Sequence, residues 1–305
     1  MSYSHTPVLF NECMDALKIM PGGLYMDCTA GLGGHSAGIL ERGGNVICVD
    51  RDPQAITRLH ERFDGNPHAT IIQANFFDCK QILNDMGISS LNGILADLGV
   101  SSIQLDNPAR GFSFHNDAPL DMRMDNSGTT AADAVNTLDE QSLADILTRF
   151  ADEPFARRIA RSIVTAREAS PITTTIQLAD IIRDAVPAAA RRDGHPARRT
   201  FQALRIYING EIERLPNAMD NLFDCLAPGG KLACISFHSL EDRIVKQAFA
   251  RQCKGCECPP NFPKCVCGIT PRGKKAGKPR VPNKEELEAN PRSRSAKLRV
   301  IERLG

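Results

Sequence analysis

A glycine-rich stretch that follows a short apolar run is the first place where this sequence could bind a ligand. Residues 29–36 read TAGLGGHS, directly after Asp27 and Cys28. Glycines at the end of a strand let a ligand approach bare backbone. A dinucleotide-binding turn needs a third glycine where Ser36 stands, and a nucleoside-triphosphate loop needs a lysine that is absent here. The stretch therefore lacks the parts specialised for phosphate, and a tight structural turn also accounts for it.

Acidic and aromatic residues follow the next apolar runs. Asp50 ends the second run, nineteen residues after Gly31, close to the spacing at which a carboxylate accepts hydrogen bonds from ribose hydroxyls. Asn75 and Phe76 follow the third run and could hydrogen-bond and stack on a base, although core packing explains a phenylalanine equally well. The fourth run ends in Asp97.

Ribose-binding residues without phosphate-binding residues fit S-adenosylmethionine. The sulfonium of this molecule carries a positive charge beside the reacting carbon, so the carboxylates of Asp27 and Asp97 also fit it electrostatically. Because open α/β sheets bind ligands beyond the carboxyl ends of their strands, we expect these side chains to meet in one crevice.

The elements that would position these residues are short apolar runs separated by segments of helical spacing. Each run has little polar alternation, as expected for strands of a parallel sheet that is buried on both faces. The alternation with helices predicts a doubly wound, mostly parallel α/β sheet. The predicted strands lie within residues 23–30, 45–50, 70–75, 93–98 and 231–237, with a last edge strand near the C-terminus.

About 130 residues separate the fourth and fifth predicted strands, far more than one crossover requires. Helical spacing is present at 140–150, 154–168 and 175–186, which predicts an inserted all-helical subdomain over residues 106–199. The sheet domain would then comprise residues 1–105 and 200–305. A long amphipathic stretch, interrupted at Pro216, returns to the sheet, and residues 255–295 are predicted to be loop.

The composition is that of a globular protein, and the charge is unevenly distributed. No apolar run approaches the length that spans a bilayer and no secretory signal is evident, so we expect a cytoplasmic protein without a membrane partner. Residues 251–305 contain 14 Lys and Arg against 5 Glu, a net charge of +9 in a chain of +1, which leaves −8 for residues 1–250. A basic tail of this kind indicates either a polyanion contact or a solvated tail.

Eleven cysteines without a secretory signal argue against a disulfide framework. Six of them are scattered along apolar segments, as buried free thiols are. The other five could supply a tetrahedral zinc site or remain reduced in a proline-rich loop, and no metal ligand is assigned from the sequence. These five are Cys253, Cys256, Cys258, Cys265 and Cys267.

Several long motifs, in order along nearly the whole chain, resemble the bacterial 16S rRNA (cytosine N4)-methyltransferase H family. The motifs that carry this resemblance are HTPVL (5–9), TAGLGGHS (29–36), DRDPQAI (50–56), DLGVSS (97–102), GFSF (111–114), PLDMRMD (119–125), RTFQALRI (199–206), ISFHSLEDRIVK (235–246) and NPRSRSAKLR (290–299).

The resemblance implies a class I methyltransferase (Rossmann-like) domain with an inserted helical domain and an activity in EC class 2.1.1. It implies S-adenosylmethionine as the donor and, as the acceptor, a cytidine in the decoding (P-site) region of 16S rRNA in the small ribosomal subunit. Carried over by motif, the cofactor-binding positions are Gly33, Gly34, His35, Asp50, Phe76, Asp97 and Gln104. Gln104 depends on the resemblance alone, and an oligomer is possible.

Asp97 is the candidate catalytic residue because it is the acid expected nearest the methyl group. An exocyclic cytosine amine is a poor nucleophile, so a carboxylate that orients it and accepts its proton would help transfer. A role for Asp97 in cofactor binding alone is equally consistent with the sequence. Many amino-methyltransferases have prolines and an aromatic residue after this acid, whereas this chain has Leu-Gly-Val, so the base-stacking partner is open between Phe112 and Phe114.

Other residues could contact RNA. His238 at the end of the fifth strand could touch substrate, beside a predicted capping box of Ser239 and Asp242. Basic side chains could hold RNA phosphates, in which case binding would weaken steeply with salt. They are Arg191, Arg192, Arg198, Arg199, Arg292, Arg294, Lys297 and Arg299. Two other classes of protein are a nicotinamide-dependent oxidoreductase, which Ser36 disfavours, and a non-catalytic RNA-binding protein.

Overall fold

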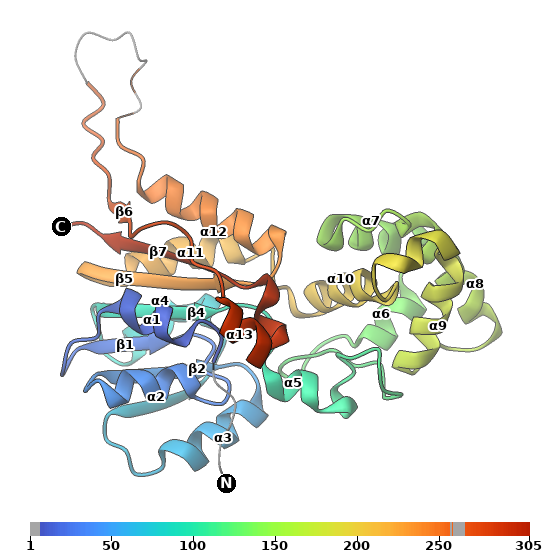
Figure 1. The fold of residues 1–305 in the computed structure, drawn as a ribbon, viewed down its shortest axis with the longest axis horizontal. Coiled ribbons are helices and arrows are strands. Elements are labelled where there is room, and N and C mark those ends of the chain that lie inside the picture. The colour runs from blue at the N-terminus through green and yellow to red at the C-terminus, as the bar shows by residue number, and fades with distance from the viewer. Residues whose placement is uncertain (1–6, 257, 259–265) are drawn as a thin grey trace. The chain divides into compact units, whose positions relative to one another are not determined.

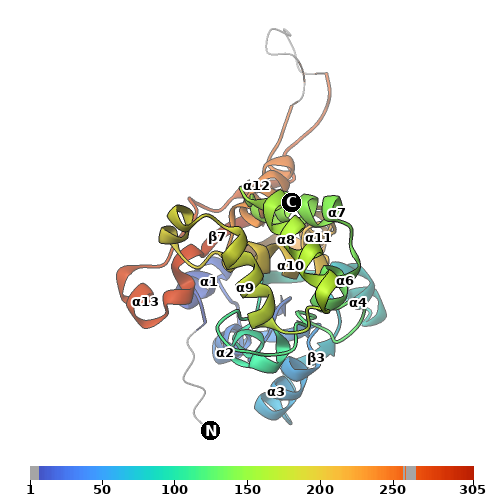
Figure 2. The ribbon, with the colours of Figure 1, turned by 90° about the vertical axis from the view of Figure 1, so that its right-hand side faces the viewer.

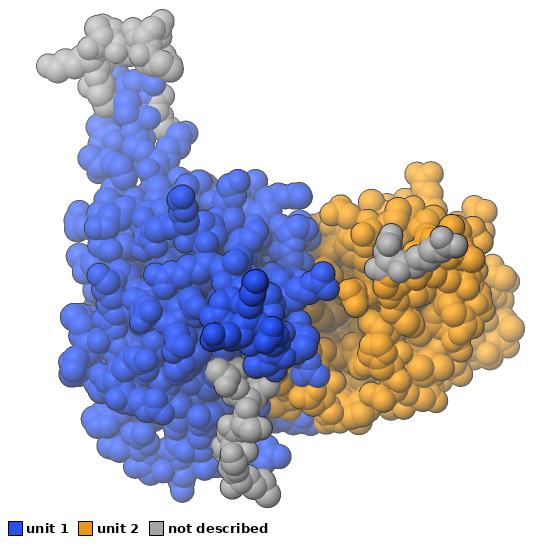
Figure 3. All heavy atoms as spheres, in the orientation of Figure 1, with its two compact units in different colours: residues 1–99, 214–305 blue, residues 100–213 orange. Residues whose placement is uncertain are grey.

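The computed structural model describes residues 7–256, 258 and 266–305. The chain divides into two compact units, coloured separately in Figure 3. Residues 1–99 and 214–305 form the first unit, and residues 100–213 form the second. The division therefore falls six residues before the predicted start of the insertion and fourteen residues after its predicted end. The later end arises because α10 (Ala197–Asn209) packs against α7 (Glu140–Ala151) of the second unit.

Within the described residues, seven strands of the first unit form one sheet in the order β3-β2-β1-β4-β5-β7-β6 (Figure 1). The first five strands are mutually parallel, and β7 is antiparallel to both of its neighbours. Because the chain moves outward from β1 to β3 and then returns to β4, the topological switch point lies between β1 and β4. The strands are β1 (Leu24–Asp27), β2 (Asn45–Asp50), β3 (Ala69–Gln73), β4 (Leu91–Asp97), β5 (Leu226–Ser236), β6 (Gly273–Lys275) and β7 (Lys297–Arg303).

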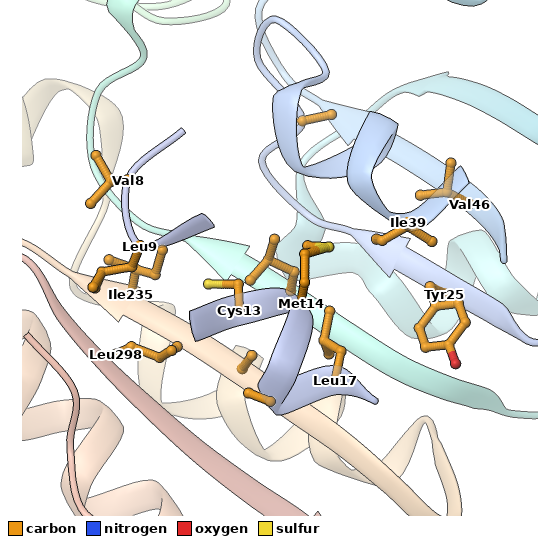
Figure 4. Packing of buried hydrophobic residues seen from close by; sticks show 14 of the residues in the cluster. Val8, Leu9, Cys13, Met14, Leu17, Tyr25, Ile39, Val46, Ile235 and Leu298 are labelled. Carbon is orange, nitrogen blue, oxygen red and sulfur yellow. The ribbon is translucent and has the colours of Figure 1, made fainter. Parts of the chain in front are cut away.

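Helices cover both faces of the sheet, as a parallel sheet of apolar strands requires. On one face lie α1 (Phe10–Leu17), α2 (Gly34–Glu41) and α3 (Pro53–Phe63), which share a core with β1, β2, β4, β5 and β7. Figure 4 shows Leu9 beside Ile235 of β5, with Cys13 and Leu17 farther along the α1 segment in the same cluster. On the opposite face, α11 (Leu215–Asp224) contacts both α4 (Cys79–Asp85) and α12 (Ser239–Gln252).

The predicted doubly wound sheet is confirmed, with three local differences. The C-terminal strand β7 is not at the edge, because β6 pairs with its outer side. Residues 273–275 were predicted to be loop, and their Gly-Lys-Lys sequence has no apolar pattern that would reveal a strand. The predicted loop also contains α13 (Lys284–Ala289), which Asn283 caps by accepting from Glu286 N–H. Finally, β5 begins at Leu226, five residues before the predicted start of this strand at residue 231.

The second unit is helical, as Figure 2 shows from the side of α6 to α10. The three predicted helices correspond to α7, α8 (Ala156–Ala169) and α9 (Thr175–Ala185). Two shorter helices, α5 (Ser102–Asp106) and α6 (Ala131–Thr137), were not predicted. The amphipathic stretch breaks at Gly210, which has φ +59°, and Pro216 lies in the first turn of α11 instead of interrupting a helix.

Buried Asn209 holds the irregular segment of the second unit against α10. Its side-chain oxygen accepts from Met124 N–H at 2.8 Å, and its Nδ2 donates to the Met122 carbonyl at 2.8 Å. Met122 itself has φ +64° and is fully buried, so the two hydrogen bonds fix a backbone conformation that a methionine rarely adopts. Among the described residues, no helix is both long enough and apolar enough to cross a membrane.

Candidate cofactor site

The glycine-rich turn lies between β1 and α2, next to the topological switch point. Gly31 and Gly33 have φ +53° and +73°, values that favour glycine. A Cβ at Gly33 would lie 2.6 Å from the ring of Phe63, and a Cβ at Gly34 would overlap the ring of Pro7. These glycines are thus required by packing within the protein, and the clearance they provide is occupied by other side chains.

The N-terminus of α2 faces the same end of the sheet. Gly33 is its N-cap residue and has no side chain to cap the helix, while Ser36 N–H in the first turn donates to the carboxylate of Asp27. The N–H groups of a first helical turn have no partner within the helix and carry the positive end of the helix dipole. This terminus can therefore bind a carboxylate or another small anion through backbone donors.

Asp50, at the carboxyl end of β2, is tied to the glycine turn. Its Oδ2 accepts from Gly31 N–H at 2.8 Å, and its Oδ1 accepts from Asp52 N–H at 2.9 Å. Burial raises the pKa of Asp50 to about 6 despite these hydrogen bonds. Asp52 caps α3 by accepting from Gln54 N–H, and Pro53 occupies the first turn.

Asp97, at the carboxyl end of β4, lies beside the start of α2. Its backbone N–H donates to the hydroxyl of Thr29 at 2.8 Å, and its Oδ2 lies 3.8 Å from Nε2 of His35. That separation is too long for a hydrogen bond. The buried Oδ1 of Asp97 and Nε2 of His35 have no hydrogen-bond partner. Because buried polar atoms in proteins are nearly always paired, these atoms mark a place for a ligand.

Asp27 lies beneath the turn and is only 1 % exposed. Its Oδ2 accepts from the Ser36 hydroxyl at 2.7 Å, and burial raises its pKa to about 6. The sequence places Asp27 at the crevice, whereas the structure covers it with Ser36. Ser36, which stands where a dinucleotide site needs its third glycine, therefore supplies the hydrogen bond to the buried carboxylate of Asp27.

The site carries an excess of negative charge. Burial, reinforced by the charges of Asp27 and Glu241, raises the pKa of Asp97 well above its usual range. Burial lowers the pKa of His35 to about 4, so this imidazole is neutral at pH 7 and does not balance the acids. None of Asp27, Asp50 and Asp97 is ion-paired with a lysine or arginine of the described chain. This environment suits a cationic ligand such as a sulfonium.

The other predicted cofactor residues have different surroundings. Phe76 lies after β3 in a 3₁₀ turn, half-buried and edge-on to Phe77, with ring centroids 4.7 Å apart. Phe77 is the more buried of the two and packs under Arg214, so Phe76 retains an accessible side. Gln104 belongs to the second unit, where it is buried and forms a capping box with Ser101.

The aromatic candidates for base stacking also lie in the second unit. Phe112 is 8 % exposed and packs beside Arg110, so it offers no free face. Phe114 stacks on His195 with ring centroids 4.5 Å apart and 17° between the rings, and Phe201 approaches it edge-on. One face of Phe114 is therefore already occupied.

The predicted capping box at the start of α12 is wrong. His238 is the N-cap residue, its Nδ1 accepts from Glu241 N–H, and its Nε2 lies 3.1 Å from Glu241 Oε1. Ser239 is the first helical residue, and Asp242 instead binds the guanidinium of Arg299 in a bidentate pair. The His-x-x-Glu spacing was the sequence signal for this cap.

Several of the basic residues considered for RNA contacts have partners within the described part of the chain. Lys297 and Arg299 both pair with Asp242. Arg191 donates to the Val186 carbonyl, and Arg199 donates to the Asp152 carbonyl. The side chain of Arg192 lies outside the described part of the chain. Arg292 and Arg294 are exposed.

The sheet order with antiparallel β7, the glycine turn after β1 and the acids after β2 and β4 together define a class I methyltransferase. The chain belongs to the MraW methylase family, whose model matches residues 2–304. The donor in this family of methyltransferases is S-adenosylmethionine, as the sequence predicts. Membership in this family excludes the nicotinamide-dependent alternative.

Curated relatives match along their whole lengths. A protein of Paenibacillus sp. (strain JDR-2) named ribosomal RNA small subunit methyltransferase H is 48 % identical over 315 residues, covering 99 % of this chain and 100 % of the relative. A protein of the same name from Brevibacillus brevis is 48 % identical over 311 residues, covering 100 % and 99 %.

Solved structures show a more distant similarity. An rRNA methylase from Streptococcus thermophilus has a TM-score of 0.46 and 10 % identity, covering 99 % of this chain and 100 % of that chain. A methyltransferase from Streptococcus mutans in complex with SAH has a TM-score of 0.43 and 11 % identity, covering 98 % and 100 %. Similarity at this level carries no functional argument.

Proposed function

We propose that this protein transfers a methyl group from S-adenosylmethionine to the exocyclic N4 of a cytidine in the decoding region of 16S rRNA. The substrate class is supported by the curated relatives, which are named for methylation of small-subunit ribosomal RNA and match the chain along its whole length. The position and the base are supported by the sequence resemblance, whose motifs extend from residue 5 to residue 299.

Backbone and acidic groups of the first unit would bind the donor. The N–H groups of Gly34 and His35, in the first turn of α2, suit the carboxylate of the methionine portion. Asp50 suits the ribose, because its carboxylate lies at the carboxyl end of β2 beside the glycine turn and can accept hydrogen bonds from hydroxyl donors. Phe76 suits the base through its accessible side.

Asp97 would orient the acceptor amine and receive its proton. The amine lone pair is delocalised into the cytosine ring, so a hydrogen bond that directs it toward the methyl group assists transfer. A carboxylate of raised pKa is a stronger base than an ordinary aspartate and can accept a proton as the amine becomes cationic. The bound donor supplies an electrophilic methyl group.

The observation that carries the proposal is the unpartnered, buried Oδ1 of Asp97 at the switch point of a methyltransferase sheet. This oxygen is desolvated without a compensating donor, which costs about 1–3 kcal/mol or more for a charged group. An amine that donates to it recovers that cost. Gln104 remains a proposed cofactor residue on the resemblance alone, and His238 remains a proposed substrate contact.

Mass spectrometry of 16S rRNA tests the site of methylation. Small subunits and free rRNA from cells that lack this activity are incubated with the protein and S-adenosylmethionine, and nuclease fragments of the decoding region are sequenced by mass. One added methyl group on the N4 of one cytidine is expected. Methylation of another base, or of the ring carbon or ribose of that cytidine, would contradict the proposal.

An Asp97→Asn variant tests the role of Asp97, with Asp64→Asn at an exposed position as the matched control. Loss of a general base typically lowers kcat by about 10²- to 10⁴-fold. We expect a loss of that order with a donor Kd within a few-fold of the unmodified protein. A weakened donor Kd with an unchanged kcat would instead assign Asp97 to cofactor binding alone.

A further inference from the structure

Three cysteines meet in the loop between α12 and β6, away from the residues proposed for methyl transfer. The Sγ atoms of Cys256, Cys258 and Cys267 all lie within 4.8 Å of one another, and those of Cys256 and Cys267 are 3.7 Å apart. These three form the metal-competent cluster of the described residues. The six cysteines at positions 13 to 234 are instead buried in the first unit, where Cys79 and Cys225 form a hydrogen-bonded pair.

The sulfur spacing distinguishes a metal site from a disulfide. A disulfide would bring two sulfurs to about 2.05 Å. Zinc–thiolate bonds of about 2.3 Å in a tetrahedron place sulfurs about 3.8 Å apart. Cys267 Sγ donates to Cys256 Sγ at 3.7 Å, so the two thiols are already close to the edge length of a zinc–thiolate tetrahedron.

Backbone donors around the sulfurs also suit thiolates. Cys258 N–H donates to Cys256 Sγ at 3.4 Å, and Val266 N–H donates to Cys258 Sγ at 3.4 Å. Hydrogen bonds to metal ligands orient them and stabilise their negative charge. Within the C-x-C pair, the backbone of Cys258 thus binds the sulfur of Cys256.

The loop has little apolar burial to hold its two sides together. Arg272 N–H donates to the Gln252 carbonyl at 3.0 Å and closes the base of the loop. Farther out, Val266 is 73 % exposed and Ile269 is 43 % exposed. Cys256 and Cys258 lie on the outgoing side and Cys267 on the returning side, so one ion bound to all three would cross-link the loop. Figure 1 shows this excursion of the chain from the end of α12.

We propose that Cys256, Cys258 and Cys267 bind one structural Zn²⁺ through their thiolates and thereby order the loop between α12 and β6. Thiolate ligands select soft or borderline metals, and tetrahedral sulfur coordination is typical of zinc. Binding releases the thiol protons and involves no change of oxidation state. The sequence places another thiol, Cys265, next to this set, and it lies outside the described residues.

Metal content of the full-length protein tests this proposal. The protein is purified without an affinity tag under reducing conditions, and zinc is measured by inductively coupled plasma mass spectrometry. About one zinc per chain is expected in the unmodified protein, with less than about 0.2 in a variant carrying Ser at positions 256, 258 and 267. Cys253→Ser is the matched control, because Cys253 is in the same loop but outside the cluster, and it should retain its zinc.

Two further measurements distinguish zinc bound specifically by the three cysteines from adventitious metal. Replacement of zinc by Co²⁺ should produce the thiolate-to-metal absorption of a tetrahedral site, and this absorption should be absent from the triple variant. Chelation should accelerate proteolysis within residues 253–271 of the unmodified protein and leave that of the triple variant unchanged. Zinc-free protein, an equal zinc content in the triple variant, or a Cys256–Cys267 disulfide in the protein as isolated would overturn the proposal.

Discussion

Acidification from pH 8 to pH 5 should weaken the binding of S-adenosylhomocysteine, because Asp50 becomes protonated in the free protein. Asp50 has a pKa of about 6, raised by its burial at the end of β2. If its carboxylate accepts hydrogen bonds from the ribose, the ligand binds the ionised form preferentially. S-adenosylhomocysteine contains this ribose but lacks the sulfonium charge. Its Kd therefore reports the protonation of Asp50 without the electrostatic attraction between Asp97 and a cationic donor.

The magnitude follows from the fraction of ionised Asp50. With a pKa of about 6, this fraction is near one at pH 8 and about one in eleven at pH 5. The apparent Kd should therefore rise about tenfold, which corresponds to about 1.4 kcal/mol. At pH 6, binding should release about half a proton, since about half of the free protein carries the proton on Asp50.

Isothermal titration calorimetry measures both quantities. Titrations at pH 5 to 8 give the Kd, and titrations at pH 6 in buffers of different ionisation enthalpy give the number of protons released. Asp50→Asn should bind more weakly at pH 8 and show a nearly flat profile, whereas Asp64→Asn should keep the profile of the unmodified protein. His35 has a pKa of about 4 and does not titrate in this range.

A Kd that is constant between pH 5 and pH 8, with no proton released at pH 6, would refute the reasoning. It would mean that the ribose does not depend on the ionised Asp50. A tenfold change that persists in Asp50→Asn would assign the titration to another group and refute the placement of the ribose at Asp50.

Two further predictions concern stability. Gly33→Ala should lower the free energy of unfolding by about 2–4 kcal/mol, because the new Cβ combines a strained φ of +73° with overlap onto the Phe63 ring. Gly65→Ala, at φ +68° in open space, should cost only about 1 kcal/mol, and equal losses in urea denaturation would remove the packing argument. The raised pKa of Asp27 means that its stabilising contribution is present at low pH and is lost as pH rises through about 6. The ligand-free protein should thus lose about 1 kcal/mol from Asp27 between pH 5 and pH 8, and Asp27→Asn should abolish that part of the slope in urea denaturation.

Local patterns were sufficient to predict the mostly parallel sheet and the positions of most of its strands. Apolar runs that end in Asp50 or Asp97 predict strands whose carboxyl ends carry acids, and this pattern depends only on residues that are adjacent in the chain. Helix spacing likewise predicted α7 to α9. Short or polar elements such as β6 were missed, because three residues of Gly-Lys-Lys have no periodicity and become a strand only through pairing with β7.

The sequence did not show why a particular residue type is needed at a given position, because the side chains that contact it are distant in the chain. The glycine at position 33 is required by Phe63, thirty residues later. Arg299 was one of the residues that could hold RNA phosphates, and Asp242, fifty-seven residues earlier, binds its guanidinium.

The cofactor site and the cysteine loop show most clearly what the sequence alone determines and what only the tertiary structure decides. Residue types and spacing along the chain indicated a sulfonium nucleoside ligand and a cluster of five thiols, and the motif resemblance indicated a methyltransferase, since all of these are visible in one dimension. Burial is not visible there. The raised pKa of Asp50, the neutral His35, the unpartnered oxygen of Asp97 and the 3.7 Å between two sulfurs arise only when the folded chain excludes water and brings separate segments together.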